Sequence, residues 1–442
     1  MALMRIVIDW VLILMSSYLA IRAVDRLLTG RNTSLGNYVI AVTWLFCVLP
    51  ILFDYLIGLP KYRTIYWYAP FVEAMANDDV SIVYDGLILS SIIAIHFYCV
   101  SHFRKEDRTA ALKWSTSLGE CNPLLCLGML LPLVHVVFSG LLPYLKIYGD
   151  PATRGMPEGS SVAVNAFLLI GLISAAIWFF GRSKRTGIHI MTFIVYSGAL
   201  AWISGKRFMI ALMLMVYLFF MLSVEVSEAN RRKIRLLIPM GLLCLAAFSA
   251  FYLIGIRPLS DTSFDSVYEM LRVDFGRDDV TKYVIHHELF LGDHILQFPG
   301  QSFLSTFLVF VPRFLWAAKP YQHFQYLTSS ILNLPIPLLP AGTTPSWWEM
   351  CIANFSYLGL IAAPLLLVGF IALADKAKAV SIRGTLLILL VALLTQSVDA
   401  YISLIILLFI QQGFALFISR RKPHEQITER AYRAKRAWDY GR

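Results

Sequence analysis

Long apolar runs, separated by short polar connections, fill most of this chain. The typical run of about 17 to 23 residues matches the length that a helix needs to cross a hydrocarbon core of ~30 Å. The runs lie near residues 6–22, 37–58, 82–100, 121–142, 161–180, 187–204, 207–224, 235–256, 351–373, 384–398 and 400–418. Because helices satisfy their own backbone polar groups in lipid, the pattern predicts an all-α polytopic membrane protein with about eleven transmembrane helices.

Composition agrees with this class. Of 442 residues, 58% are hydrophobic and 15% charged, and the mean hydropathy is +0.67, whereas a soluble domain of this length carries more charge. The first run contains Asp9 and lacks a clear small-residue cleavage site, so we expect it to stay as a membrane helix. The six cysteines have neither metal-ligand spacing nor a disulfide framework pattern and are expected to be core residues.

Basic residues fall on every second connection, which the positive-inside rule assigns to the cytoplasm. These connections carry Arg22, Arg26, Arg31, Arg104, Lys105, Arg108, Lys113, Arg182, Lys184, Arg185, Arg231, Arg232, Lys233, Arg235, Lys376, Lys378 and Arg383. The N-terminus is therefore expected outside and the C-terminus in the cytoplasm. The net charge of +10 is concentrated in part in the tail, which favours contact with anionic lipid over nucleic-acid binding.

Four regions follow from this topology. We expect an N-terminal bundle of about eight helices over 1–256, one large outward-facing loop over 257–348, further transmembrane helices over 349–419 and a basic cytoplasmic tail over 420–442. The run Phe303 to Leu315 is short for a span and contains Pro312 and Arg313, so a re-entrant or interfacial segment is expected there. A crossing would raise the count to about twelve and break the charge alternation.

The outward connections hold the candidate chemistry. Lys206 and Arg207 join two apolar runs with almost no loop, and they either snorkel to headgroups or bind an anionic ligand, since Arg matches phosphate oxygens with bidentate donors. A second cluster spans Ser266 to Leu291, where Val267, Met270, Leu271, Val280, Val284 and Leu289 approximate one apolar stripe of a surface helix that Gly276 interrupts.

In that second cluster, the charged side chains are expected to project toward the outer cavity or to form a plain ion-paired surface; they are Arg272, Asp274, Arg277, Asp278 and Lys282. Asp274 and Arg277 are three residues apart and could touch on one helical face. His286 and His287 are adjacent, so they point in different directions and do not form a metal pair. Either one is a structural histidine or a titrating group.

A third cluster runs from Val311 to Pro320 and reads Val-Pro-Arg-Phe-Leu-Trp-Ala-Ala-Lys-Pro. Its prolines fix the backbone around Arg313 and Lys319. The nearby aromatic residues either form an interfacial belt or offer faces on which sugar rings stack; they are Trp316, Tyr321, Trp347 and Trp348. Asp-x-Asp pairs at helix ends, histidine-rich metal boxes and Walker-type loops are lacking in the sequence. Their absence indicates either a lipid-linked sugar donor in place of a nucleotide sugar or no glycosyl transfer at all.

Four motifs resemble those of the Wzy-type oligosaccharide repeat-unit polymerases of bacterial surface polysaccharide synthesis. They are Ser-Gly-Lys-Arg at 204–207, Arg277 with its neighbours in 273–279, the Pro-Arg…Trp…Lys-Pro run at 312–320, and Asn-Phe-Ser-Tyr-Leu-Gly at 354–359. The third is the most specific. Lys206 departs from the usual pattern, in which a small or polar residue often precedes the arginine.

The resemblance implies a fold related to membrane glycosyltransferases that use polyprenyl-linked donors. It implies transfer of a growing glycan from undecaprenyl diphosphate to another lipid-linked repeat unit, on the outer face of the bacterial cytoplasmic membrane, without metal or cofactor. A chain-length regulator and a flippase are implied partners. Cations would stabilise the leaving diphosphate, namely Arg207, Arg277 and Arg313 with Lys206 or Lys319. The acceptor hydroxyl needs a base, for which the candidates are Asp274, Glu349, His286 and His287.

Two other functions are compatible with this hydropathy. An O-antigen ligase would transfer finished glycan to a lipid A core, but the Pro-Arg…Trp…Lys-Pro run favours the polymerase. A transporter or flippase of lipid-linked oligosaccharides would more typically show two equivalent halves with interrupted helices at mid-membrane. Here the polar residues lie late in the chain and on the outward side.

Overall fold

In a computed structural model of the protein, all regular structure in the described part of the chain is helical. The structure describes residues 2–30, 32–63, 68–102, 123–146, 148–149, 154–156, 160–182, 186–224, 240–241, 243, 263–308, 311, 313–339, 342–377, 380–396 and 405. Five helices in these ranges are long and apolar enough to cross a membrane: Leu3–Thr29, Leu35–Leu56, Asp78–Ser101, Gly187–Ser204 and Tyr357–Asp375. They identify a multi-pass membrane protein.

Helices in the first half of the chain are α1 (Ala2–Thr29), α2 (Leu35–Thr43), α3 (Leu49–Leu56), α4 (Ala69–Ala76), α5 (Asp78–His102), α7 (Pro123–Phe138), α8 (Ser160–Phe180), α9 (Gly187–Ser204) and α10 (Arg207–Val224). The second half holds α12 (Phe264–Phe275), α13 (Asp278–Ile285), α14 (Gln301–Phe307), α15 (His323–Leu332), α16 (Trp347–Phe355), α17 (Tyr357–Asp375) and α18 (Val380–Thr395). A π-helical turn, Trp44–Val48, joins α2 to α3.

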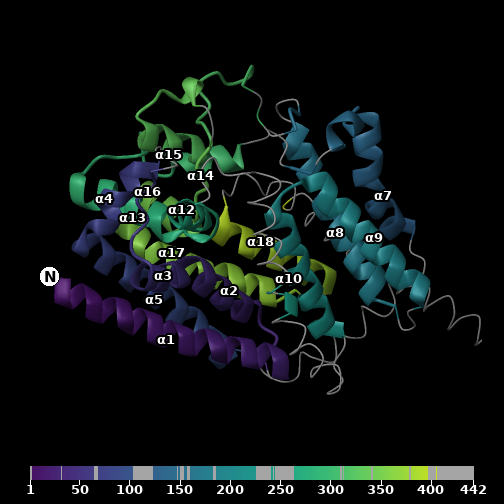
Figure 1. Cartoon of the computed structure of the whole chain (residues 1–442), viewed down its shortest axis with the longest axis horizontal. Coiled ribbons are helices and arrows are strands. Elements are labelled where there is room, and N and C mark those ends of the chain that lie inside the picture. Colours follow the sequence, from purple (N-terminus) through teal and green to yellow (C-terminus); the bar gives the residue numbers. More distant parts are fainter. Residues whose placement is uncertain are drawn as a thin grey trace, which may run out of the picture.

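A bundle of α1, α2, α5 and α17 forms one side of the molecule (Figure 1). Its core is aliphatic, with Leu12, Ile92 and Leu367 fully buried. A second group, α7 to α9, lies beside it, and α10 and α18 pack between the two groups (Figure 1). Small residues allow close packing there: a Cβ atom at Gly171 would lie 2.5 Å from the Tyr196 hydroxyl and 2.9 Å from Pro132.

The two ends of the bundle carry different polar contacts. At one end, Arg383 donates to the carbonyl of Thr33 at 2.7 Å, and Arg26 lies 3.5 Å from His96. At the opposite end, Arg5 pairs with Asp78 at 3.2 Å. The connection that contains Thr33 and the beginning of α18 therefore lie at the same end of the bundle, as the alternation of basic residues predicts.

Nine of the eleven predicted apolar runs contain a helix in the described residues. Five of these helices are long enough to cross a membrane, and four are shorter apolar helices. The runs 235–256 and 400–418 and the tail 420–442 lie almost wholly outside the described residues. In the segment 303–315, α14 has seven residues, a rise of about 10 Å. That is too short to cross a bilayer and agrees with an interfacial or re-entrant segment.

Candidate functional site: a buried charge cluster beside an anchored arginine

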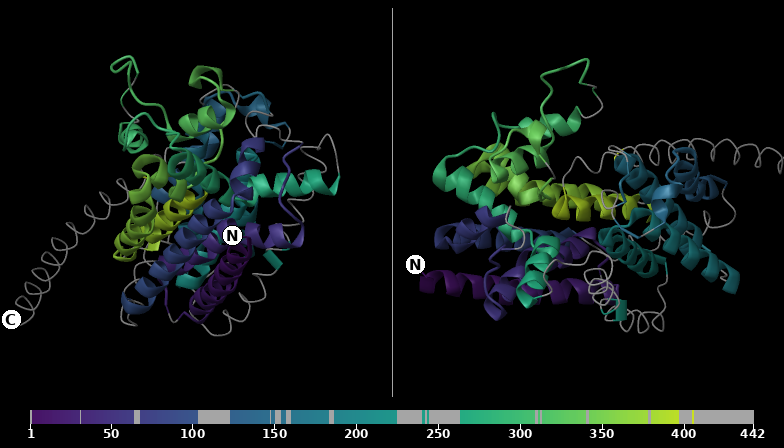
Figure 2. Two further views of the ribbon diagram at one scale, coloured as in Figure 1. Left: turned by 90° about the vertical axis from the view of Figure 1, so that its left-hand side faces the viewer. Right: turned by 45° about the horizontal axis from the view of Figure 1, so that its top comes forward.

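The segment from α12 to α16 caps the end of the bundle that carries Arg5 and Asp78. Its centre is α13, which packs against α4, α5 and α16. Figure 2 shows these green elements gathered at the end of the bundle where the N-terminus lies. The polar residues of the predicted loop are thus assembled as a folded layer on the transmembrane helices.

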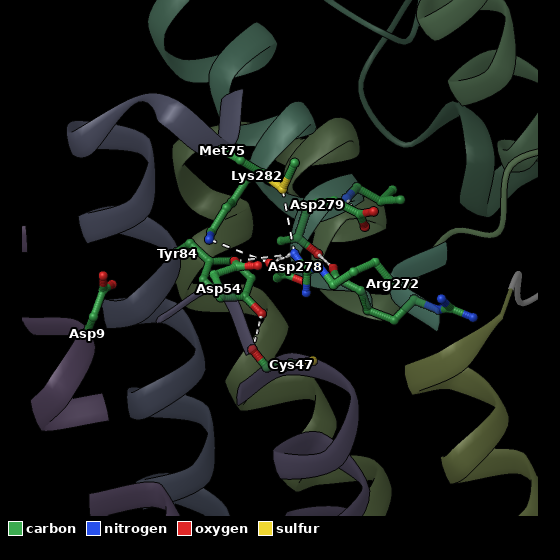
Figure 3. A network of polar contacts seen from close by, with 12 residues as sticks. Asp9, Cys47, Asp54, Met75, Tyr84, Arg272, Asp278, Asp279 and Lys282 are labelled. Carbon is green, nitrogen blue, oxygen red and sulfur yellow. Dashed lines mark hydrogen bonds and ion pairs between the residues drawn. The ribbon is translucent and has the colours of Figure 1, made fainter. Parts of the chain in front are cut away.

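The strongest interaction in this layer is a buried ion pair between α12 and α13 (Figure 3). Arg272 donates from Nη1 to Oδ1 of Asp278 at 2.9 Å and from Nη2 to Oδ2 at 2.8 Å. The two side chains are 1% and 0% exposed. Parallel bidentate bonds of this kind are the strongest form of an Arg–carboxylate contact, and here they fix the angle between the two helices.

Three further charged residues complete what we call the charge cluster: Asp54, Arg272, Asp278, Asp279 and Lys282. Asp54, from the end of α3, lies 3.5 Å from Arg272 and accepts a hydrogen bond from the Tyr268 hydroxyl at 3.0 Å. The Lys282 ammonium lies 3.6 Å from Asp278 and 5.1 Å from the ring centre of Tyr84 on α5. The cluster therefore ties α12 and α13 to two transmembrane segments.

Adjacent carboxyl groups in the charge cluster have opposite proton affinities. Burial alone would raise the pKa of Asp278, but Arg272 and Lys282 outweigh it and hold that pKa below its ordinary value. For Asp279, burial and the neighbouring Asp278 charge raise the pKa. Asp279 accepts from the Tyr62 hydroxyl at 2.8 Å and from the Val280 amide at 2.7 Å. The negative charge of the pair is thus concentrated on Asp278.

Burial of this cluster corrects one prediction from the sequence. Arg272, Arg277, Asp278 and Lys282 were expected to project toward an outer cavity or to form an ion-paired surface, but all four are buried. The face of α12 that packs inward carries Ser266, Glu269 and Arg272 together with Tyr268, and the predicted apolar stripe of α12 is only partly buried. The physical reason is mutual neutralisation, because paired and hydrogen-bonded charges can be buried. Gly276 does end the first helix, as predicted.

Arg277 lies between α12 and α13, and its guanidinium is bonded to carbonyl oxygens, whereas that of Arg272 is paired with carboxylates. Its guanidinium donates to three carbonyl oxygens: Thr395 at 3.0 Å, Gly276 at 2.6 Å and Val273 at 3.3 Å. Its backbone amide donates to the carbonyl of Phe46 at 3.0 Å. Within the described residues no carboxylate pairs with Arg277, and its Nη2 makes no hydrogen bond. The Arg277 guanidinium is therefore a cation of fixed orientation, and its Nη2 can still donate hydrogen bonds to an anion.

The predicted bases are placed in different environments. Glu349 is fully buried; its Oε1 accepts from the Ser346 amide at 2.6 Å, and its Oε2 lies 3.0 Å from Nε2 of His323. Both oxygens have protein partners, so Glu349 caps α16 and joins it to α15. The Asp274 side chain lies outside the described residues, and its contact with Arg277 is untested.

The adjacent histidines point to different surroundings, as expected. His286 is 7% exposed, and burial lowers its pKa. The centre of the His287 ring lies 4.2 Å from that of Tyr283, with the two rings tilted by 37°, and its Nδ1 lies 3.0 Å from Oδ2 of Asp293. The His287 side chain keeps 21% exposure, so it is a carboxylate-oriented imidazole with an accessible edge.

The third cluster folds on itself. Arg313 donates to the carbonyl of Lys319 at 2.9 Å and lies 4.0 Å from the ring centre of Tyr321. The Lys319 ammonium donates back to the carbonyl of Val311 at 2.9 Å. Arg313 is exposed and Trp316 is partly exposed. The Pro-Arg…Trp…Lys-Pro run is therefore a closed loop that presents one cation and aromatic surface.

Two predicted sugar-stacking residues are corrected by their burial. Trp347 and Trp348 are 2% and 0% exposed. Their indole nitrogens donate to the carbonyl of Ala363 at 2.9 Å and to the hydroxyl of Ser91 at 3.2 Å. Their ring faces contact protein and leave no room for a sugar. They anchor α16 to α17 and α5, a role typical of aromatic side chains that bury large surfaces.

The turn at 204–207 is built around glycine and a residue that sequence inspection missed. Gly205 has φ +63° and ends α9 in the left-handed conformation. Arg154 donates to the carbonyls of Ile203 at 2.9 Å and Trp202 at 2.5 Å, which places a cation at the negative end of α9. Lys206 is partly exposed, and the Arg207 side chain lies outside the described residues.

Within the described residues, no group of three or more His, Cys, Asp or Glu side chains could hold a metal ion. In comparisons with protein-family models, characterised proteins and solved structures, no significant match to this chain was found.

Proposed function

We propose that this protein is a membrane glycosyltransferase that polymerises undecaprenyl-diphosphate-linked oligosaccharides on the outer face of the bacterial cytoplasmic membrane. The observation that carries the proposal is the contrast between two arginines five residues apart along the chain. Arg272 is neutralised by Asp278 and Asp54. Arg277 is oriented by carbonyl groups and lies 5.8 Å from the ring centre of Phe46, with no carboxylate partner within the described residues, so its positive charge remains for a ligand.

Arg277 fits the chemical need of this reaction. When the acceptor hydroxyl oxygen bonds to the anomeric carbon of the donor, the bond from that carbon to the diphosphate oxygen breaks and the diphosphate gains negative charge. A preorganised guanidinium stabilises charge that develops in this way, and the free Nη2 of Arg277 offers it donors. Arg313, exposed on its closed loop, is the second proposed contact for the lipid-linked substrate.

His287 is the predicted base that the geometry favours. Asp293 orients its Nδ1, which leaves Nε2 for the proton of the acceptor hydroxyl. About ten residues of helix separate it from Arg277, a rise of about 15 Å. We therefore place the diphosphate at Arg277 and the acceptor sugar toward His287, at the two ends of the buried helix α13. Glu349 serves to position α16 in this scheme, because both its oxygens are engaged.

Surface-glycan length tests the proposal in a strain that lacks the gene. Glycans that stop at one repeat on their final acceptor, with full length restored by the wild-type chain, support a polymerase. Undelivered lipid-linked chains of normal length would instead indicate the O-antigen ligase. Loss of all outward-facing intermediates would indicate a transporter or flippase.

The same strain tests Arg277. Arg277→Ala should reach the membrane but leave single-repeat glycans, because the leaving diphosphate loses its oriented cation. The matched control is Arg22→Ala, an exposed arginine at the opposite end of the bundle whose described contact is the ring of Tyr18 at 5.9 Å; it should restore full length. Long glycans with Arg277→Ala would refute the assigned role.

A further inference from the structure

Two carboxylic acids face each other inside the transmembrane bundle, apart from the proposed ligand site. Asp9 lies on α1 and Asp85 on α5, and they are 3% and 1% exposed. The Asp85 side chain lies next to the carboxyl group of Asp9, close enough to share a hydrogen bond. Asp85 lies seven residues after Asp78 on α5. It is therefore about 10 Å inside the bundle, measured from the end that carries Arg5 and Asp78. Figure 3 shows Asp9 on α1, beside the charge cluster.

Hydrogen bonding around the two acids is uneven. Asp9 accepts from the Tyr55 hydroxyl at 2.6 Å and pairs with Arg5 at 3.6 Å. For Asp85, neither carboxylate oxygen has a hydrogen-bond donor among the described residues. An ionised buried carboxylate without donors is strongly disfavoured. A proton on Asp85 removes this cost, because a carboxyl group donates to the facing carboxylate.

The charges around the Asp9–Asp85 pair favour one negative charge and one proton on the two carboxyl groups. The ionisable groups around it are Arg5 on α1, Tyr55 on α3, Tyr84 on α5 and Lys282 on α13. Arg5 is shared with Asp78, and the Lys282 ammonium contacts Asp278. These cations support one negative charge on the Asp9–Asp85 pair better than two, since facing carboxylates repel.

We propose that Asp9 and Asp85 form a proton-binding site in the transmembrane bundle and share one proton at neutral pH. Acids in a membrane interior are rare and expensive, and they commonly mark proton sites. Tyr55, which is 38% exposed and bonded to Asp9, connects the pair to the surface. Lys282, a member of the charge cluster, also acts on this pair, so uptake or loss of the proton changes the electric field at α13.

Infrared difference spectroscopy of the purified protein in lipid tests the site. The carboxylic-acid carbonyl band at pH 7 should lose one carboxyl group's intensity in Asp85→Asn relative to the wild type. Asp293→Asn, which alters a carboxylate with 70% exposed side chain, should leave the band unchanged. Asp85→Asn should also unfold at a temperature no lower than the wild type, because asparagine mimics the protonated acid.

Three results would overturn the proposal. One is an unchanged acid band in both Asp85→Asn and Asp9→Asn. Another is a band that sodium chloride abolishes at constant pH relative to choline chloride, which would make the pair a metal-cation site. The third is an Asp85→Asn protein that unfolds several degrees below the wild type, which would mean that the ionised carboxylate is the native form.

Discussion

Arg272 and Asp278 illustrate how charged side chains are retained in an apolar protein. Each is almost completely buried, and each satisfies the other through two parallel hydrogen bonds. Such a pair contributes little relative to a well-packed apolar substitute, but removal of one partner leaves an uncompensated buried charge.

We therefore expect Asp278→Ala to lower the free energy of unfolding by about 3–5 kcal/mol. The cause is that Arg272 loses its bidentate partner. Asp54, the carboxylate that remains, lies 3.5 Å from the Arg272 guanidinium and does not replace the two short hydrogen bonds. Thermal unfolding in detergent measures the effect, with Arg22→Ala as the control that should unfold like the wild type. Equal stability of Asp278→Ala and wild type would mean that the pair is not sealed from water.

The contribution of Asp279 to the stability of the fold should change with pH in the opposite direction to that of Asp278. Since its pKa is raised in the folded protein, its protonated form stabilises the fold fully below the ordinary aspartate pKa of about 3.9, and this contribution disappears as the pH rises through the raised value. Asp279→Asn keeps an uncharged side chain at every pH. Its unfolding temperature relative to wild type should therefore increase with pH, and a difference that is constant or falls with pH contradicts the assignment.

At the scale of single elements, the α9–α10 turn depends on one glycine. Gly205 adopts φ +63°, and a Cβ atom there would collide with the carbonyl oxygen of Gly149. The left-handed conformation alone costs a residue with a side chain about 1–2 kcal/mol. Gly198, within α9, has open space around it and helical backbone.

Alanine should accordingly have opposite effects at Gly205, the C-cap of α9, and at Gly198 within α9. Gly205→Ala should destabilise the protein by more than about 1 kcal/mol, while Gly198→Ala should be neutral or stabilise it by up to about 1 kcal/mol. Unfolding temperatures of the two variants in the same detergent provide the measurement. Similar values for both would show that the turn adopts another conformation.

Helix positions were largely predictable from the sequence, because runs of apolar residues long enough to span lipid leave few alternatives to a helix. The layer over residues 263–355 was predictable as polar but not in its packing. The apolar stripe of α12 suggested a membrane face, yet Arg272 is buried by partners that come from α3 and α13. Contacts over more than two hundred residues of sequence, such as that of Arg272 with Asp54, leave no local pattern to detect.

The candidate site residues show the same difference between what the local sequence predicts and what long-range contacts decide. Arg277 and His287 were chosen for their chemistry, and their surroundings are compatible with it. Trp347 and Trp348 were chosen for exposed ring faces that they do not have. Asp85 and Arg154 were overlooked, because a single charged residue in an apolar or loop segment gains meaning only from its neighbours. The facing acid of α1 and the carbonyls of α9 supply those neighbours here.

On the scale of the whole molecule, the contacts of Arg5, Arg26 and Arg383 fit a bundle with two chemically distinct ends. Arg26 and Arg383 belong to one end and the α12–α16 layer to the other. By the positive-inside rule, the layer with Arg277 and His287 is predicted to face the cell exterior, as the proposed polymerase requires.

Cysteine accessibility tests this orientation. In a chain whose native cysteines are replaced by alanine, Asp293→Cys should react with a membrane-impermeant maleimide on intact cells whose outer envelope is open to the reagent. Arg22→Cys, exposed at the opposite end, should react only after the cytoplasmic membrane is permeabilised. The reverse pattern would place the layer in the cytoplasm and exclude an outward-facing site.

The most direct test of the proposed activity uses the purified protein in lipid, with an undecaprenyl-diphosphate-linked oligosaccharide repeat unit as the only substrate. A polymerase should convert it to a ladder of lipid-linked products that differ by whole repeat units, and Arg277→Ala should leave the substrate unchanged. Failure of the folded wild-type protein to form any product longer than the substrate unit would contradict the proposed function.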